Sequence, residues 1–460
     1  MTDSMEASLR QALEGCVVSI ARHTAGDSGY TNPDGNHVAA PLGTVFVELE
    51  LSPAEGSLIR VEVALPPKDR WDGRLVGIGN GGGGGFLPKD FGYYLGRGCA
   101  ITTTDLGTKR NPPQAGFNNP EVWKDFGHRA THLAMVAGRA VASEFYGRPP
   151  KFVYFIGGST GGQQAMSLAQ RHPLDCDAII AAVPAHDRVA LHAYFLWNYQ
   201  ATHRADNSPL FTDEQERSWR KTVLDLFSAR ETLPRARGCF VSDPRWSNEL
   251  IEESLRRAVA NDPSLTPEHI EALRRLCHGP VHAVTGQKLY GGIPPAAAFG
   301  PACRNLYLFE WVFGVGCDLM DIDFGDDYDR YAAALSPDLD ANNVDLDAFR
   351  DNGGKLLVYS GTADSCVPWH ATAEWYSRLV GRYGGDIGAV REFCLYYLLP
   401  GREHGGGPGV QFIRDEFKLL TNWREKGIAP APIGHGMVPP AFDLRLEPYG
   451  AAPSRQTSRW

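Results

Sequence analysis

The sequence lacks the features that mark membrane-spanning and nucleic-acid-binding proteins. No apolar run approaches the ~20 residues that cross a bilayer. Lys and Arg number 45 against 54 Asp and Glu, which gives a net charge of −9 without a long basic block. Such a chain offers no positive face to nucleic acid or to an anionic membrane. Hydrophobic residues make up 43% of the chain and charged residues 22%, which excludes a disordered or fibrous protein.

Cysteine patterns typical of metal sites are also missing. The nine cysteines form no CxxC pair and show no metal-ligand spacing. The segment 1–8 has neither the positive n-region nor the apolar h-region of a secretory signal. An odd cysteine count without a signal favours reduced thiols, so we expect a cytoplasmic protein.

Apolar patterns along the chain predict an α/β fold with an insertion. Alternating and buried-strand patterns are followed by a helical pattern and then by further strands, which favours a mainly parallel sheet with helices on both faces. From about residue 190 to 335 strand patterns become scarce. We therefore predict a core formed by 1–189 and 336–460, interrupted by an inserted lid at 190–335. The predicted strands are 58–65, 74–79, 98–104, 151–156, 178–183, 355–359 and 393–399, with helices at 128–146 and near 410–426.

A nucleophile turn is predicted between the strand 151–156 and the helical segment after it. Gly157, Ser159 and Gly161 form the pattern G-x-S-x-G. A tight strand-to-helix turn of this kind projects the serine hydroxyl above the sheet, and glycines relieve its crowding. The following helix N-terminus favours negative charge. Ser159 is therefore the candidate nucleophile, and the alternative is a surface serine in a glycine-rich turn.

Two later loops supply the candidate acid and base. Asp364 follows the strand 355–359, and His404 follows the strand 393–399. Loops at the carboxyl ends of parallel strands converge on one crevice, and the order Ser, Asp, His is that of α/β-hydrolases. We predict a triad in which Asp364 orients His404. His370 follows Asp364 too closely to lie on the next strand's loop.

A glycine tract at 81–85 follows the strand 74–79 and lacks the Lys-Ser/Thr of a phosphate-binding loop. It is similar to the oxyanion loop of esterases, in which backbone N–H groups stabilise developing negative charge. The candidate donors are the N–H groups of Gly82, or of a neighbouring glycine, and of Thr160. The alternative is a flexible surface loop.

These motifs, in this order, resemble the tannase and feruloyl esterase family over about residues 45 to 430. The resemblance is carried by 79–82, 103–105, 127–130, 154–166, 169–173, 265–292, 349–361, 399–404 and 422–430. It implies an α/β-hydrolase core, an inserted lid and hydrolysis of small esters of aromatic acids.

Two departures from the family pattern concern a disulfide and a Ca²⁺ ion. The family commonly joins a cysteine before the nucleophile to one after the histidine, where this chain has Gly158 and Gly405. The family's lid commonly holds Ca²⁺, but the matching stretch 230–245 offers only Glu231 at a ligand-like position. The acidic stretch 318–329 lacks EF-hand spacing and predicts a solvated loop. We expect neither a metal nor an organic cofactor.

His128 and His132 form an i, i+4 pair on the predicted helix 128–146. No acidic ligand pattern accompanies them, so we predict structural histidines.

The main functional hypothesis is a serine esterase acting on aromatic esters through an acyl-enzyme. An acyltransferase or cyclising enzyme would use the same triad with another acceptor. A non-catalytic binding protein is the third possibility, and the retention of all three triad residue types argues against it.

Overall fold

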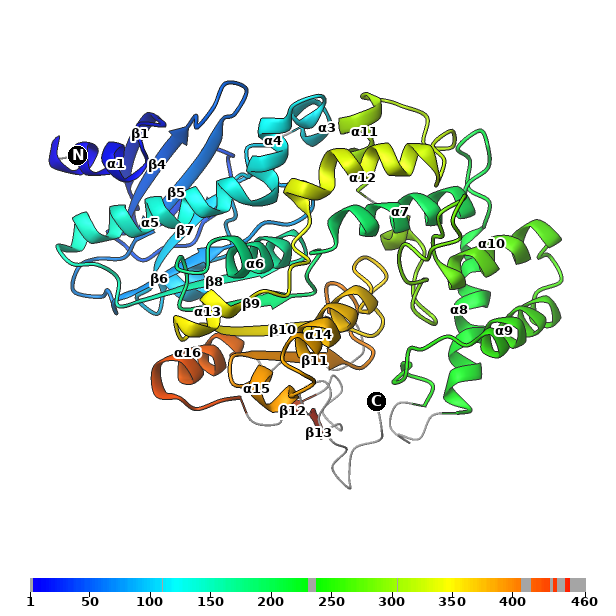
Figure 1. Cartoon of the computed structure of the whole chain (residues 1–460). Helices are drawn as coiled ribbons and strands as arrows, with labels where there is room; N and C mark the ends of the chain where they lie inside the picture. The colour runs from blue at the N-terminus through cyan, green and yellow to red at the C-terminus, as the bar shows by residue number, and fades with distance from the viewer. Residues whose placement is uncertain are drawn as a thin grey trace.

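The chain is built around one large twisted sheet (Figure 1). The structure, a computed structural model, describes residues 3–109, 111–230, 237–303, 305–406, 415–430, 433–436 and 443–446. Within these residues the sheet has nine strands. In sheet order they are β1 (Val17–Thr24), β4 (Val45–Leu51), β5 (Ile59–Leu65), β7 (Ala100–Thr104), β6 (Arg74–Ile78), β8 (Phe152–Gly158), β9 (Ala178–Ala182), β10 (Lys355–Gly361) and β11 (Cys394–Leu399).

The sheet has an antiparallel edge and a parallel body. β1, β4, β5 and β7 pair antiparallel, whereas all neighbours from β7 to β11 pair parallel. All seven predicted strands exist, and the predicted mainly parallel sheet is confirmed. The carboxyl ends of β6, β8, β10 and β11 therefore meet at one edge, where ligand sites of such sheets form.

Helices cover both faces of the sheet and separate two hydrophobic clusters. α5 (Ala130–Tyr146), α6 (Thr160–Arg171) and α14 (His370–Arg382) pack on one face, and α2 (Gly92–Leu95) and α16 (Glu416–Lys426) pack on the other. α1 (Asp3–Ala12) contacts α5. α5 ends at Gly147, whose positive φ of 73° glycine adopts readily. No described helix is both long and apolar enough to cross a membrane.

The segment between β9 and β10 is helical and has a hydrophobic cluster of its own. α8, α9 and α10 stand beyond the end of the sheet in Figure 1, and residues such as Trp219, Leu255 and Leu273 bury one another there. The predicted lid boundaries at 190 and 335 fall inside α7 and α12, while the division into domains stays a prediction. The helices of the segment are α7 (Arg188–Thr202), α8 (Asp213–Ser228), α9 (Asn248–Asn261), α10 (Pro267–His278), α11 (Tyr307–Phe313), α12 (Asp326–Leu339) and α13 (Asp347–Asp351).

Short elements complete the described chain. They are α3 (Pro112–Gly116), α4 (Pro120–Lys124), α15 (Ile387–Arg391), a π-helical turn (Asp125–Arg129), a 3₁₀ turn (Gly300–Cys303), and the small pairs β2 (Tyr30–Thr31) with β3 (His37–Val38) and β12 (Ile433–Gly436) with β13 (Asp443–Leu446). The π-helical turn replaces the first two residues of the helix predicted at 128–146, so α5 begins at Ala130.

Glu62 is a buried carboxyl group in the middle of β5. Its side chain lies 1% exposed, with neither oxygen hydrogen bonded. It lies opposite Glu48 on β4 and Thr103 on β7. Burial, together with the charges of Glu48 and Asp34, raises the pKa of Glu62 to about 8. Glu62 is therefore largely protonated in the folded protein at neutral pH.

We predict that Glu62→Gln stabilises the protein above the ordinary glutamate pKa. Between about pH 4.5 and pH 8 the unfolded chain loses the Glu62 proton while the folded chain keeps it, so native stability falls as pH rises. Glutamine removes this titration. Urea unfolding of both proteins should show a stability gain that grows across this window and levels off above about pH 8. Glu50→Gln on β4, a partly exposed position, is the control; equal pH profiles for both variants would contradict the prediction.

Candidate active site

Ser159 stands at the sharp turn between β8 and α6. Its φ of 60° and ψ of −118° are unusual for a residue with a side chain. The turn is held by the bonds from Ser159 N–H to Ala182 O (3.0 Å) and from Ala185 N–H to Ser159 O (3.1 Å). A Cβ added at Gly157 would lie 2.2 Å from Gly161 O, so this position requires glycine. The strained strand-to-helix geometry predicted from G-x-S-x-G is present.

Asp364 and His404 are brought together as predicted. His404 Nδ1 lies 2.8 Å from Asp364 Oδ2, although 40 residues separate them along the chain. The other oxygen of Asp364 accepts the N–H groups of Cys366 and Val367, each at 2.9 Å. The Asp364 side chain is fully buried and that of His404 is 30% exposed. A carboxylate held in this way fixes the imidazole and leaves Nε2 free to act.

The charge of Asp364 changes the basicity of His404. Burial alone would lower the pKa of the imidazole, but the hydrogen bond and the negative charge of Asp364 together raise it above its ordinary value. His404 is consequently a stronger base than a free histidine.

Topology places Ser159 at the same edge of the sheet as this pair. β8 carries Ser159 at its carboxyl end, and the loops after β10 and β11 carry Asp364 and His404. Within the described part of the chain, no hydrogen bond joins Ser159 to His404. The structure therefore pairs Asp364 with His404, and strand order places Ser159 at the same edge of the sheet as this pair.

The glycine tract that precedes α2 is fixed by side chains at its two ends. Asn80 donates from Nδ2 to Phe86 O (3.0 Å) and to Thr104 O (2.9 Å), which draws the ends of the tract together. Thr108 Oγ1 donates to Gly83 O at 2.6 Å. The tract is therefore an anchored turn and not the flexible loop that was the alternative.

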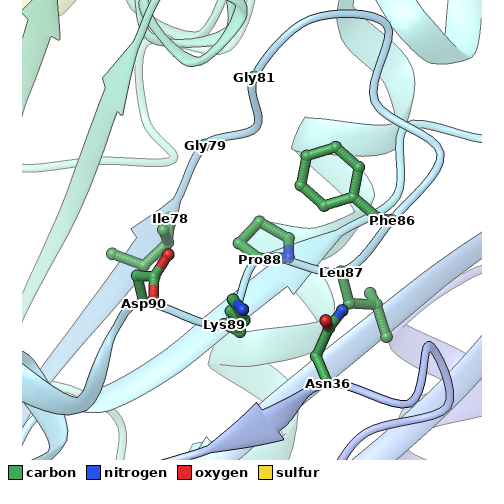
Figure 2. Close-up of a pocket in the computed structure, with 9 residues that line it drawn as sticks. All are labelled: Asn36, Ile78, Gly79, Gly81, Phe86, Leu87, Pro88, Lys89 and Asp90. Carbon is green, nitrogen blue, oxygen red and sulfur yellow. The ribbon is translucent and has the colours of Figure 1, made fainter. Parts of the chain in front are cut away.

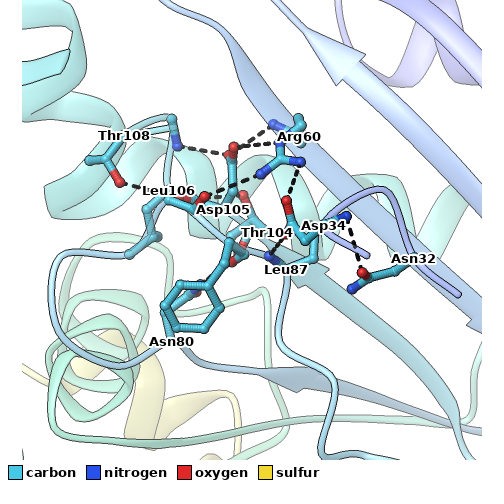
Figure 3. A network of polar contacts seen from close by, with 12 residues as sticks. Asn32, Asp34, Arg60, Asn80, Leu87, Thr104, Asp105, Leu106 and Thr108 are labelled. Carbon is cyan, nitrogen blue, oxygen red and sulfur yellow. Dashed lines mark hydrogen bonds and ion pairs between the residues drawn. The ribbon is translucent and has the colours of Figure 1, made fainter. Parts of the chain in front are cut away.

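Arg60 ties the far end of the tract to the sheet (Figure 3). Its guanidinium bonds Asp105 Oδ2 and Asp34 Oδ1, both at 2.8 Å, and donates to Gly85 O at 3.2 Å. Asp34 in turn accepts the N–H of Leu87 at 2.6 Å. An arginine fork that joins two carboxylates and a carbonyl restricts all three segments at once.

The predicted oxyanion residues Gly82 and Thr160 are in direct contact. Thr160 Oγ1 donates to Gly82 O at 2.6 Å, and Gly82 takes a positive φ of 56°. Arg188 Nη2 and Tyr307 OH donate to the same carbonyl at 3.1 and 3.4 Å. Among the described residues, the N–H groups of Gly82 and Thr160 have no acceptor in the protein. Arg188 and Tyr307 carry no local motif, so the sequence did not point to them.

A cavity adjoins the glycine tract (Figure 2). Its volume is about 440 Å³, within the range of small-molecule sites. Apolar side chains form much of the wall, and Phe86 is 41% exposed. The lining residues are Asn36, Ile78, Gly79, Gly81, Phe86, Leu87, Pro88, Lys89 and Asp90.

No acidic ligand pattern accompanies His128 and His132 in the sequence, but the fold brings an acid to each, and their structural role stays a prediction. His132 Nδ1 lies 2.7 Å from Asp175 Oδ2, and His128 Nε2 lies 3.5 Å from Asp338 Oδ1. The ring of His132 stacks on His172, with 3.9 Å between centroids. Asp175 and Asp338 lie close to the histidines in the fold but far from them along the chain, so sequence spacing could not reveal them. His132, His172 and Asp175 together offer three ligand atoms at distances that suit a metal.

The two stretches considered as metal sites are 230–245, which the structure describes only in part, and 318–329. Asp326–Asp329 belong to the first turn of α12 instead of the predicted loop, where carboxylates favour the helix N-terminus. Glu231, the single ligand-like residue of the other stretch, lies outside the described residues.

Comparison with known proteins identifies the chain's relatives. The family model for "Tannase and feruloyl esterase" matches residues 47–306 and 307–435. The chain belongs to this family. An uncharacterised esterase of Xanthomonas campestris pv. campestris is 26% identical over 88% of this chain and 79% of its own length. A probable feruloyl esterase B-2 of Aspergillus flavus is 25% identical over 84% of this chain and 78% of its own.

The fold agrees with the family. The crystal structure of feruloyl esterase B from Aspergillus oryzae superposes with a TM-score of 0.81 at 20% identity and covers 96% of both chains. The resemblance and the α/β-hydrolase fold are thus confirmed, and the chain is a carboxylic ester hydrolase. The cytoplasmic location stays a prediction.

All nine cysteines lie in the described part of the chain, and no disulfide joins any two of them. Gly158 and Gly405 stand where family members commonly carry a disulfide. Among the described residues, a Cβ at Gly158 would come no closer than 3.5 Å to any neighbour, and one at Gly405 would meet nothing within 4 Å. Neither glycine has a positive φ, so both positions accept cysteine without backbone strain.

We predict that Gly158→Cys with Gly405→Cys forms a disulfide under mild oxidation. If the two loops face one another as in the family, their Cα atoms lie within the ~4.4–6.8 Å that a disulfide spans. The oxidised double variant should lose two titratable thiols and melt at a higher temperature, because the crosslink restricts the unfolded chain. Gly405→Cys alone is the control. A folded double variant that keeps both new thiols free would mean that Ser159 and His404 are not neighbours.

Proposed function

We propose that this protein is a serine esterase that hydrolyses esters of phenolic acids through an acyl-enzyme. The hydrogen bond between His404 and Asp364, at the sheet edge that carries Ser159 on its strained turn, is the observation that supports this most. Serine is a weak nucleophile unless a positioned base removes its proton. His404 has a raised pKa and a free Nε2, which suits it to that role.

In the first half-reaction Ser159 Oγ attacks the ester carbonyl and His404 Nε2 takes its proton. Asp364 holds the Nδ1 proton of the imidazole and stabilises the imidazolium that forms. The carbonyl oxygen becomes negative and is stabilised by the N–H groups of Thr160 and of the glycine tract near Gly82. Collapse of the intermediate breaks the ester bond, and His404 gives its proton to the leaving alcohol.

In the second half-reaction water replaces the alcohol. His404 takes a proton from water as the oxygen attacks the acyl-enzyme, and it returns this proton to Ser159 Oγ when the acid leaves. The same donors stabilise the second oxyanion. Water is the only co-reactant of these steps, and each proton transfer is made by His404.

The cavity beside the glycine tract is the proposed place for the aromatic part of the ester. Gly79 and Gly81 belong to its wall, so a ring in the cavity lies next to the proposed oxyanion donors. Phe86 offers a partly exposed aromatic face on which such a ring can stack. The relatives named feruloyl esterase are consistent with a phenolic acyl group.

We predict that Ser159→Ala and His404→Ala each abolish turnover of p-nitrophenyl and methyl hydroxycinnamate esters. Asp364→Asn should keep the fold and reduce kcat by about 10⁴, because the imidazole loses its correct tautomer. Melting temperatures serve as the folding control. Wild-type-like turnover by the Ser159 or His404 variant would contradict the mechanism.

The rate should also rise with pH through the titration of His404. Only the neutral imidazole accepts the serine proton, and Asp364 raises its pKa. The acid limb of kcat/KM should therefore lie above the ordinary histidine pKa of about 6.5. An acid limb below that value would contradict the charge assigned to Asp364.

We predict that Phe86→Ala reduces the preference for aromatic esters. Loss of one ring contact should lower kcat/KM for a methyl hydroxycinnamate by about 10-fold, with little change for an acetate ester. Phe117→Ala is a matched control, because Phe117 is 42% exposed against 41% for Phe86 and does not line the cavity. An equal loss of kcat/KM on both esters in Phe86→Ala would mean that the aromatic group binds outside this cavity.

A further inference from the structure

Arg188 is a buried cation directly behind the proposed oxyanion donors. It is the first residue of α7 and is 3% exposed. Its guanidinium donates from both terminal nitrogens to Thr160 Oγ1 (3.2 Å each), and Nη2 also donates to Gly82 O (3.1 Å) and Tyr307 OH (2.7 Å). One side chain thus contacts both elements whose N–H groups face the proposed oxyanion.

Arg188 fixes the direction in which two hydroxyl groups donate. A guanidinium has donors only, so the hydroxyls of Thr160 and Tyr307 must accept from it. Each hydroxyl then has its single proton left for Gly82 O, which lies 2.6 Å from Thr160 Oγ1 and 3.4 Å from Tyr307 OH. The Gly82 carbonyl therefore receives donors from three side chains, which fix the peptide between Gly82 and Gly83 and so hold the backbone that carries the Gly82 N–H.

The charge of Arg188 has no counterion among the described residues. No carboxylate of that part of the chain lies within ion-pairing distance of its guanidinium. Asp340, which is near the start of α7, uses its Oδ1 to accept the backbone N–H of Val189 at 3.0 Å. The Cζ atom of the guanidinium lies over the Phe126 ring, 4.9 Å from its centre, and Nε finds no acceptor among the residues that the structure describes.

An unpaired buried charge is costly to keep in a folded protein. The cost is offset when a negative charge forms nearby during the reaction, and the only such charge in the mechanism is the oxyanion. A cation that is already in place stabilises this charge without reorganisation at the moment of reaction.

We propose that Arg188 is a positioning residue that sets the oxyanion hole and supplies its long-range positive charge. It does so through Thr160 and the Gly82 peptide and does not touch the substrate. The role rests on the proposed function, because it requires an oxyanion formed by attack of Ser159.

The first test compares Arg188→Met, Arg188→Lys and Tyr307→Phe. Arg188→Met should lower kcat roughly 10-fold to 100-fold with KM nearly unchanged, somewhat less than the ~10²–10³ lost when a donor itself is removed. Arg188→Lys should recover part of the rate, since it keeps the charge but not the fork of donors. Tyr307→Phe removes one hydroxyl, keeps the ring contacts and should cost only a few-fold.

The second test separates an electrostatic role from a structural one. An arylboronic acid is neutral until Ser159 Oγ bonds to boron and its proton passes to His404, which leaves an anionic tetrahedral adduct. Arg188→Met should weaken boronate inhibition by about the factor it removes from kcat, while affinity for a neutral amide analogue of the substrate stays the same. All rates are normalised to the sites labelled by a fluorophosphonate, so a misfolded fraction does not count.

Arg220→Met is the matched control. Arg220 is a partly buried arginine of α8 that donates to a backbone carbonyl, Ala296 O, at 3.0 Å. Its kcat and boronate affinity should equal those of the wild type. Unchanged kcat per labelled site in Arg188→Met, or unchanged boronate affinity, would overturn the role of Arg188 and leave the triad intact. Failure of the fluorophosphonate to label Ser159 in the wild type would overturn the proposed function itself.

Discussion

The structure at the sheet edge depends on hydrogen bonds that are donated to the carbonyl groups of a glycine tract. A run of glycines has no side chains to pack, and it loses more conformational entropy on folding than any other sequence. Its position must therefore come from outside. Asn80 and Thr108 hold it on one side, and Thr160, Arg188 and Tyr307 hold Gly82 on the other. The carbonyls of Gly82 and Gly83 are thus occupied, while the N–H of Gly82 has no acceptor among the described residues.

Sequence motifs were sufficient for the residues that lie in local patterns. Ser159 stands in G-x-S-x-G after a strand, and Asp364 and His404 follow strands in the order that parallel sheets bring together. Their positions after strands, together with the triad order of α/β-hydrolases, therefore predicted that Asp364 and His404 meet. The strand β4 was overlooked, although its alternating Val45, Val47, Leu49 and Leu51 carried the signal.

Partners that lie outside sequence motifs and strand ends could not be predicted. Arg60 and Asp105 are 45 residues apart, and Arg188 and Gly82 are 106 apart. No periodicity or motif links such positions, since each pairing results from the packing of whole elements. The acid beside His132 was missed for the same reason, because Asp175 lies on a different segment.

The contacts of Gly82 also bear on how such an enzyme can change. Arg188 begins the helical segment inserted between β9 and β10, and Tyr307 begins α11 within the same segment. Both reach the Gly82 carbonyl, so this segment contributes contacts to the site as well as forming its own hydrophobic cluster. Exchange of the whole segment between relatives would alter the reaction rate together with substrate choice. Substitutions confined to α8–α10, whose side chains bury one another in a separate cluster, leave more room for new specificity.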